Sequence, residues 1–149
     1  MLKIIKGDLL DITEGIICHQ VNCQRVAGAG LALQIRNKWP EWYRAFKNDH
    51  PWLGRALVTK VAHELFVASL YAQDDYGTGR CFTDYKAFED ALATLKFMTW
   101  QRREHAPELS ILPVYFPKGI GCGLAGGDWR VIEPMIERYF PNAILVEKP

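Results

Sequence analysis

The sequence predicts an α/β fold in which helices cover both faces of a largely parallel sheet. Apolar, strand-like runs alternate with segments whose apolar residues recur every three or four positions, the spacing of an amphipathic helix. Three of these runs lead into polar or glycine-rich loops, at residues 22–30, 73–79 and 118–127. Alternation of this kind is typical of parallel strands joined by helices that pack on both sides of the sheet.

The size and the charge of the chain narrow the possible functions. The chain has 149 residues, of which 49% are hydrophobic and 23% charged, so we expect residues 1–149 to form one globular domain. Lys and Arg number 18 against 17 Asp and Glu, a formal net charge of +1. This balance gives no electrostatic reason for a nucleic-acid groove or an anionic membrane surface. Any bound anion must therefore be held by local groups.

The apolar runs and the cysteines indicate the compartment. No apolar run approaches the length of a membrane span, and the N-terminal stretch MLKIIKGDLL is too charged for a signal peptide. We therefore expect a cytoplasmic protein with no membrane partner and with reduced cysteines. The cysteine spacing matches no zinc finger or ribbon, so we expect no metal and no cofactor. A zinc site built from Cys18, His19, Cys23 and Cys122 is the alternative.

Four strands and two helices are expected in the first half of the chain. The strands are predicted at residues 2–6, 15–18, 56–61 and 64–71, and the helices at residues 31–39 and 41–47. Pro40 breaks the first helix and can start the second. The run 64–71 is strongly apolar, which predicts burial on both of its faces.

Two helices and two strands are expected in the second half. Thr83 or Asp84 is predicted to cap a long helix that ends near Arg103. A buried strand is expected at residues 110–116 and a final strand at 143–147. Asp128 is predicted to cap the last helix, with a distorted start caused by Pro134.

Two glycine-bearing loops predict a site for phosphates. The strand at 15–18 leads through polar residues to Gly28-Ala29-Gly30 and then to a helix N-terminus, where free N–H groups and the helix dipole favour an anion. Residues 118–127 contain five glycines. The carboxyl ends of parallel strands meet at one edge, so the loops should converge into a cradle of backbone N–H groups for two phosphates. Tight turns without a ligand are the alternative.

The motifs resemble those of the macrodomain family of ADP-ribose-binding proteins. The matching pieces are Gly7-Asp8-Leu9-Leu10, then Asn22 before Gly28-Ala29-Gly30, and PKGIGCGLAGGDW near the end. The match runs through nearly the whole chain in the same order. The resemblance implies a three-layer α/β/α fold with a mixed, largely parallel sheet. It also implies ADP-ribose or a derivative as the small-molecule ligand of a monomer, with nucleic acid only as a modified substrate.

The resemblance also implies a set of ligand contacts. Asp8 would accept a hydrogen bond from the adenine amino group, although the residues alone predict a helix cap for it. Leu9 would offer its backbone to the adenine ring, and Asn22 would contact the distal ribose. One phosphate and the distal ribose would be wrapped by Gly28, Ala29 and Gly30. The other phosphate would be wrapped by Gly119, Ile120, Gly121, Cys122 and Gly123, with Leu124 beside them.

The implied activity depends on His19. The segment His19-Gln20-Val21-Asn22-Cys23 is similar to the branch of ADP-ribose 1″-phosphate phosphatases. That likeness implies His19 as general base or nucleophile beside Asn22, with Asp74 or Asp75 as its partner, chemistry that these side chains permit. A strand-end histidine held by backbone groups is the alternative reading of His19.

Two other functions remain open. The segments GLALQIRNKWP and GCGL are similar to the branch that removes ADP-ribose from glutamate or DNA bases, with Asp74 or Asp75 as the base. That branch depends on a lysine in the loop before the long helix, and residues 73–76 contain none. Some of its members also carry an aspartate where this chain has Ala125. A reader module that binds ADP-ribose without catalysis is the third possibility.

Overall fold

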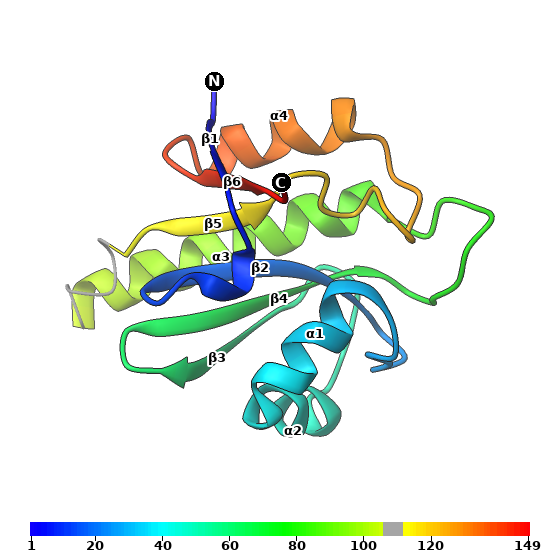
Figure 1. The fold of residues 1–149 in the computed structure, drawn as a ribbon, viewed down its shortest axis with the longest axis horizontal. Helices are drawn as coiled ribbons and strands as arrows, with labels where there is room; N and C mark the ends of the chain where they lie inside the picture. Colours follow the sequence, from blue (N-terminus) through cyan, green and yellow to red (C-terminus); the bar gives the residue numbers. More distant parts are fainter. Residues whose placement is uncertain (106–111) are drawn as a thin grey trace.

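The computed structural model describes residues 1–105 and 112–149 and has helices on both faces of a mixed sheet (Figure 1). The strands of the described part are β1 (Lys3–Lys6), β2 (Gly15–Asn22), β3 (Ala56–Ala62), β4 (Leu65–Gln73), β5 (Val114–Pro117) and β6 (Ile144–Glu147). Its helices are α1 (Gly30–Lys38), α2 (Pro40–Asn48), α3 (Tyr85–His105) and α4 (Trp129–Tyr139), with a short 3₁₀ turn η1 (Leu9–Asp11). The predicted α/β class is confirmed.

The strand order places the expected loops together. The described sheet runs β1-β6-β5-β2-β4-β3, with every neighbouring pair parallel except β3 and β4. β2 lies between β5 and β4, so the carboxyl ends of these three strands, at Asn22, Gln73 and Pro117, share one edge of the sheet. The predicted convergence of the three loops is therefore confirmed.

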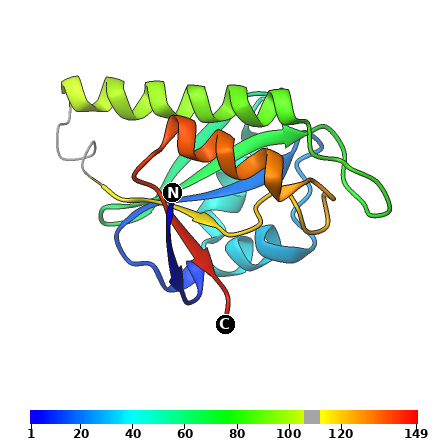
Figure 2. The same cartoon turned by 90° about the horizontal axis from the view of Figure 1, so that it is seen from above.

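Two hydrophobic layers hold the helices on the sheet. α3 and α4 cover one face, and α1 and α2 cover the other (Figure 2). Successive side chains of β2 point to opposite faces of the sheet. Ile16 and Cys18 pack in the layer with α3 and α4, whereas Ile17 and Val21 pack in the layer with α1 and α2. β4 is buried along almost its whole length, as its apolar sequence predicts.

Some element boundaries differ from the prediction. β2 continues past Cys18 to Asn22, because His19 and Gln20 pair with Ser69 and Leu70 of β4 and their polar side chains find partners inside the fold. The polar residues that indicate a loop in the sequence are therefore the end of a strand.

The helix starts agree with the capping residues. Asp84, rather than Thr83, caps α3, since its Oδ1 accepts a hydrogen bond from the Ala87 N–H at 3.0 Å. Asp128 caps α4 as predicted, and that helix runs unbroken through Pro134.

Part of one predicted strand cannot be compared. Ser110 and Ile111 of the expected strand 110–116 lie outside the described residues, and β5 covers the remainder from Val114. Among the helices of the described chain, none is long and apolar enough to cross a bilayer.

Candidate functional site

A cleft of about 690 Å³ opens at the carboxyl edge of β2, β4 and β5. Its walls come from the end of β2, from residues 26–32 except Ala27, from Gln73 and residues 76–78, and from residues 117–125 except Cys122. This volume lies within the range of small-molecule pockets, roughly 300–1,000 Å³. The cleft also lies where ligands bind in open α/β sheets.

One wall of the cleft is the N-terminus of α1. Ala29 occupies the N-cap position and has no side chain that could accept a hydrogen bond from the helix. The first N–H groups of the helix, starting at Gly30, have no acceptor within it, since the first such bond runs from Leu33 to Ala29. Gly30 has a φ of +58°, a conformation that favours glycine. The result is an uncapped helix end that suits an anion.

The opposite wall is the glycine-rich segment after β5. Backbone hydrogen bonds from Ile120 to Pro117 at 3.0 Å and from Cys122 to Gly119 at 2.9 Å fold it into successive turns. Gly121 has a φ of +76°, a conformation that favours glycine, and a Cβ there would lie 2.8 Å from Gln20 Oε1 of β2. The segment therefore comes close enough to the sheet to present its backbone to the cleft.

Leu124 brings the two walls together. Its side chain lines the cleft and is 56% exposed. Its Cδ1 lies 3.5 Å from the position that a Cβ on Gly30 would occupy. The two glycine-bearing loops thus approach each other across the cleft.

A polar network beneath the cleft ties β2 to the segment after β4 and to the glycine-rich segment after β5. Gln20 Nε2 donates to Gln73 Oε1 at 2.8 Å and to Thr83 Oγ1 at 2.9 Å. The Thr83 hydroxyl donates in turn to the Gly121 carbonyl at 2.6 Å. The sequence prediction missed the roles of Gln73 and Thr83, although a glutamine at the end of each of two neighbouring strands was a usable signal.

Asn22 closes the loop that it starts. Its Oδ1 accepts from the Val26 N–H at 3.0 Å, and its Nδ2 donates to the Val26 carbonyl at 2.9 Å. The residue lines the cleft but is only 7% exposed. Its predicted contact with a ribose stays a prediction, while its structural role in residues 22–26 is visible.

His19 lies on the floor of the cleft and is 1% exposed. Its Nε2 is 2.6 Å from Ser69 Oγ, which also accepts a hydrogen bond from Trp42 Nε1 at 2.8 Å. The imidazole and the indole meet edge to face, with ring centroids 5.1 Å apart. Burial lowers the pKa of His19 to about 3, so the ring is neutral at physiological pH. Side chains, rather than backbone groups, hold this histidine.

The structure does not bring Asp74 and Asp75 to His19. Both residues line a separate hollow, which they share with Arg80 and residues up to the start of α3. The Oδ1 of Asp75 accepts a hydrogen bond from the Tyr76 N–H at 2.8 Å. The predicted pair of histidine and aspartate is therefore not assembled in this conformation.

Three of the predicted ligand contacts lie outside the cleft walls. Asp8 caps η1, because its Oδ1 accepts from the Leu10 N–H at 2.9 Å. Leu9 is buried in the core, and the Cys122 thiol points to the Ile120 carbonyl at 3.4 Å. The predicted residues that do line the cleft are His19, Asn22, Gly28, Ala29, Gly30, Gly119, Ile120, Gly121, Gly123 and Leu124.

The cleft offers backbone groups more than charges. Lys118 is the one charged side chain on its described walls, and the Nζ of this lysine is paired with Glu147 Oε2 at 2.6 Å. The alternative zinc site is not formed, since Cys18 and His19 point to opposite faces of the sheet. Within residues 1–105 and 112–149, no three histidine, cysteine or acidic side chains are grouped as a metal site.

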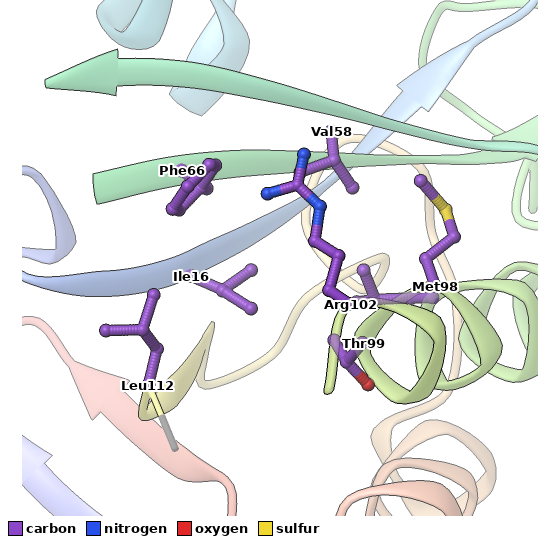
Figure 3. Close-up of a pocket in the computed structure, with 8 residues that line it drawn as sticks. Ile16, Val58, Phe66, Met98, Thr99, Arg102 and Leu112 are labelled. Carbon is purple, nitrogen blue, oxygen red and sulfur yellow. The ribbon is translucent and has the colours of Figure 1, made fainter. Parts of the chain in front are cut away.

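A second pocket lies far from these loops, between α3 and the sheet (Figure 3). Ile16, Val58 and Phe66 of the strands face Met98 and Thr99 of α3 across it. Its volume is about 30 Å³, space for no more than a water molecule or two. It is a packing gap and not a second ligand site.

The sequence was compared with those of known proteins. No family model matches it. It is 28% identical over 149 residues to an uncharacterized 17.5 kDa protein of Enterobacteria phage T4, covering 93% of this chain and 90% of that protein. It is 25% identical over 166 residues to an ADP-ribose 1″-phosphate phosphatase of Scheffersomyces stipitis, covering 93% of this chain and 95% of the phosphatase.

Solved structures share the fold. The macrodomain of Mycobacterium tuberculosis DarG superposes with a TM-score of 0.77 at 23% identity, over 100% of this chain and 97% of that one. Thermosipho africanus DarTG, solved in complex with ADP-ribose, superposes with a TM-score of 0.73 at 17% identity. That match covers 99% of this chain and 42% of the larger protein. Both superpositions show that this chain shares the fold of these structures.

Proposed function

The chain has the macrodomain fold, and from this premise we propose that its cleft binds ADP-ribose and that the protein hydrolyses an ADP-ribose derivative. The observation that carries the proposal is the pair of facing walls. The uncapped N-terminus of α1 and the turns at residues 118–125 both present backbone to the same cleft. A pyrophosphate needs donors of this kind from two sides.

The charge distribution supports a ligand held by backbone donors. Lys118 is engaged by Glu147, and Arg25 donates to the Lys47 carbonyl at 2.6 Å, away from the cleft. The positive end of the α1 dipole and the N–H groups around Gly30 are therefore the main attraction for an anion. The cleft volume leaves room for the two riboses and the base as well.

For the reaction, we favour ADP-ribose 1″-phosphate as the substrate. Water would attack phosphorus, the bond between phosphorus and the 1″ oxygen would break, and the products would be ADP-ribose and inorganic phosphate. The similarity to the yeast phosphatase supports this choice. Asp74 directly follows Gln73, which lines the cleft, so a rearrangement of residues 74–79 is what would bring a carboxylate to the substrate.

A reader of ADP-ribose without catalysis is the second candidate. The observation that favours it is the separation of His19 from Asp74 and Asp75, which line different hollows. A glycohydrolase that releases ADP-ribose from protein or nucleic acid would need the same rearrangement of the loop, because its base would be Asp74 or Asp75.

Calorimetric titration with ADP-ribose, followed by addition of ADP-ribose 1″-phosphate and an assay of free phosphate, tests the proposal. Binding with phosphate release supports both parts. Binding without release keeps the cleft assignment and overturns the phosphatase, and gels with ADP-ribosylated protein and DNA then separate a glycohydrolase from a reader. Absence of binding overturns the proposed function as a whole.

A further inference from the structure

Three buried polar side chains form one chain of contacts below the cleft. Trp42 comes from α2, Ser69 from β4 and His19 from β2, and all three are almost completely shielded from solvent. His19 and Ser69 are direct partners in the register of β2 and β4, so their side chains emerge side by side on the same face. This arrangement is built by the sheet and by α2 together, not by a loop.

The chemistry of the three groups determines which of them donates and which accepts in each hydrogen bond. An indole N–H can only donate, so Ser69 Oγ accepts from Trp42 at 2.8 Å. The hydroxyl has one proton left for the 2.6 Å contact with His19 Nε2. If Nε2 accepts that proton, the proton of the imidazole is on Nδ1.

The opposite tautomer leaves more groups unsatisfied. A proton on Nε2 would donate to Ser69, whose own hydroxyl proton would then have no acceptor among the residues that the structure describes. The Nδ1 lone pair would be unused as well. Buried polar groups without partners are unfavourable, so the tautomer with the proton on Nδ1 is preferred.

The Nδ1 atom is the open end of this chain. It is buried and has no hydrogen-bond partner in the described part of the protein. The two ring nitrogens adjoin the same carbon, Cε1, and point in different directions. Nε2 is engaged with Ser69 of β4 and His19 itself lines the cleft, so Nδ1 is the ring nitrogen that is left for a group in the cleft.

We infer that His19 is a hydrogen-bond donor to the bound ligand through its Nδ1–H, and that Ser69 and Trp42 are positioning residues that hold this tautomer. The inference rests on the proposed function, since the ligand is ADP-ribose or its 1″-phosphate. The acceptor is an oxygen at the distal end of the ligand, either a ribose hydroxyl or a phosphoryl oxygen. In this role His19 does not take a proton from water, in contrast to the general base implied by the family resemblance.

Nitrogen-15 NMR of the ligand-free protein tests the tautomer directly. Two-bond correlations between ring nitrogens and carbon-bound protons distinguish a proton on Nδ1 from one on Nε2. We expect Nδ1–H for His19, and a loss of that single state in Ser69→Ala and in Trp42→Phe. The spectrum of His19→Asn contains only the signals of the other three histidines, His50, His63 and His105, so the His19 signals are the ones that this spectrum lacks. A proton on Nε2 in the wild-type protein overturns the inference.

Calorimetry on two His19 variants tests the contact with the ligand. The side-chain nitrogen of His19→Asn takes nearly the place of Nδ1 and can donate, whereas His19→Leu has a similar volume and cannot. We expect His19→Leu to bind about tenfold more weakly and His19→Asn to recover most of that loss. Equal affinity of wild type and His19→Leu, or equal losses in both variants, overturns the inference.

The same measurements identify the acceptor on the ligand, and a second variant replaces His19→Leu if that variant does not fold. If His19→Leu weakens the binding of ADP-ribose 1″-phosphate only, the acceptor is a phosphoryl oxygen. If it weakens the binding of ADP-ribose to the same extent, the acceptor is a ribose hydroxyl. Should His19→Leu not fold, Ser69→Ala replaces it, with weaker binding together with a mixed tautomer as the expected result. A wild-type protein that binds neither compound overturns the proposed function, and the NMR result then still decides the tautomer.

Discussion

The Nε2 of His19 lies 2.6 Å from the Oγ of Ser69, in a position that solvent does not reach. The contact joins β2 and β4, which are neighbouring parallel strands of the sheet. The imidazole is neutral at physiological pH, because burial lowers the pKa of His19 to about 3 from an ordinary value of 6.5. This neutral histidine has a measurable consequence for stability.

We predict that the free energy of unfolding falls as the pH decreases from 6.5 towards 3. In this window the unfolded chain binds a proton at His19 and the native protein does not, so each pH unit costs about 1.4 kcal/mol. Urea denaturation at pH 7 and pH 4.5 should show that the free energy of unfolding of His19→Asn falls by about 2.5 kcal/mol less than that of wild type between these conditions.

The matched control for this measurement is His63→Asn, at the exposed turn between β3 and β4. It should follow the wild-type protein at both pH values. An identical acid destabilisation of wild type and His19→Asn would contradict a buried neutral His19.

Glycine at position 121 is predicted to be required for the fold of its loop. Gly121→Ala places a Cβ at a φ of +76°, which strains the backbone, and 2.8 Å from Gln20 Oε1, so the Gln20 amide must also shift. We expect a loss of about 1–3 kcal/mol in the free energy of unfolding, together with weaker ADP-ribose binding. Gly123→Ala is the control, since nothing lies within 4 Å of its Cβ and its φ is not positive. Equal stability of the two variants would refute the close packing of this loop on β2.

The shared edge of the loops could be predicted from the sequence, because it depends only on parallel strands that alternate with helices. The strand order, with β2 between β5 and β4, then brings residues 22–30 and 118–127 close to each other. The caps at Asp84 and Asp128 were also predictable, since a capping hydrogen bond is local in sequence.

The contacts across strands were not predictable in this way. Ser69 meets His19 because of the register of β2 on β4, and Trp42 reaches both because α2 packs above them. Nothing in the spacing of these residues along the chain reports that register. Asp74 and Asp75 illustrate the same limit, since a loop has no periodicity from which the direction of its side chains could be predicted.

Two threonines with opposite surroundings give a paired prediction. The Thr83 hydroxyl accepts from Gln20 and donates to the Gly121 carbonyl, whereas the Thr59 hydroxyl is buried with no partner among the described residues. Thr83→Val should lower the free energy of unfolding by about 1–3 kcal/mol, and Thr59→Val should leave it unchanged or raise it. Urea denaturation of both variants provides the measurement. Greater destabilisation in Thr59→Val than in Thr83→Val would show that the network is not the stronger constraint.

The dependence of ADP-ribose affinity on salt should be shallow. Lys118 is paired with Glu147 at 2.6 Å, and the cleft otherwise offers backbone donors, whose attraction for a phosphate acts at short range and is little screened. Calorimetry at 50 mM and 500 mM NaCl should give dissociation constants within about threefold, and Lys118→Met should change the affinity by no more than that. A fall of more than tenfold, reduced in Lys118→Met, would mean that the lysine leaves Glu147 and reaches the phosphates. A steep fall that Lys118→Met does not change would instead point to Arg80, which lies over the ring of Phe82 in the ligand-free protein.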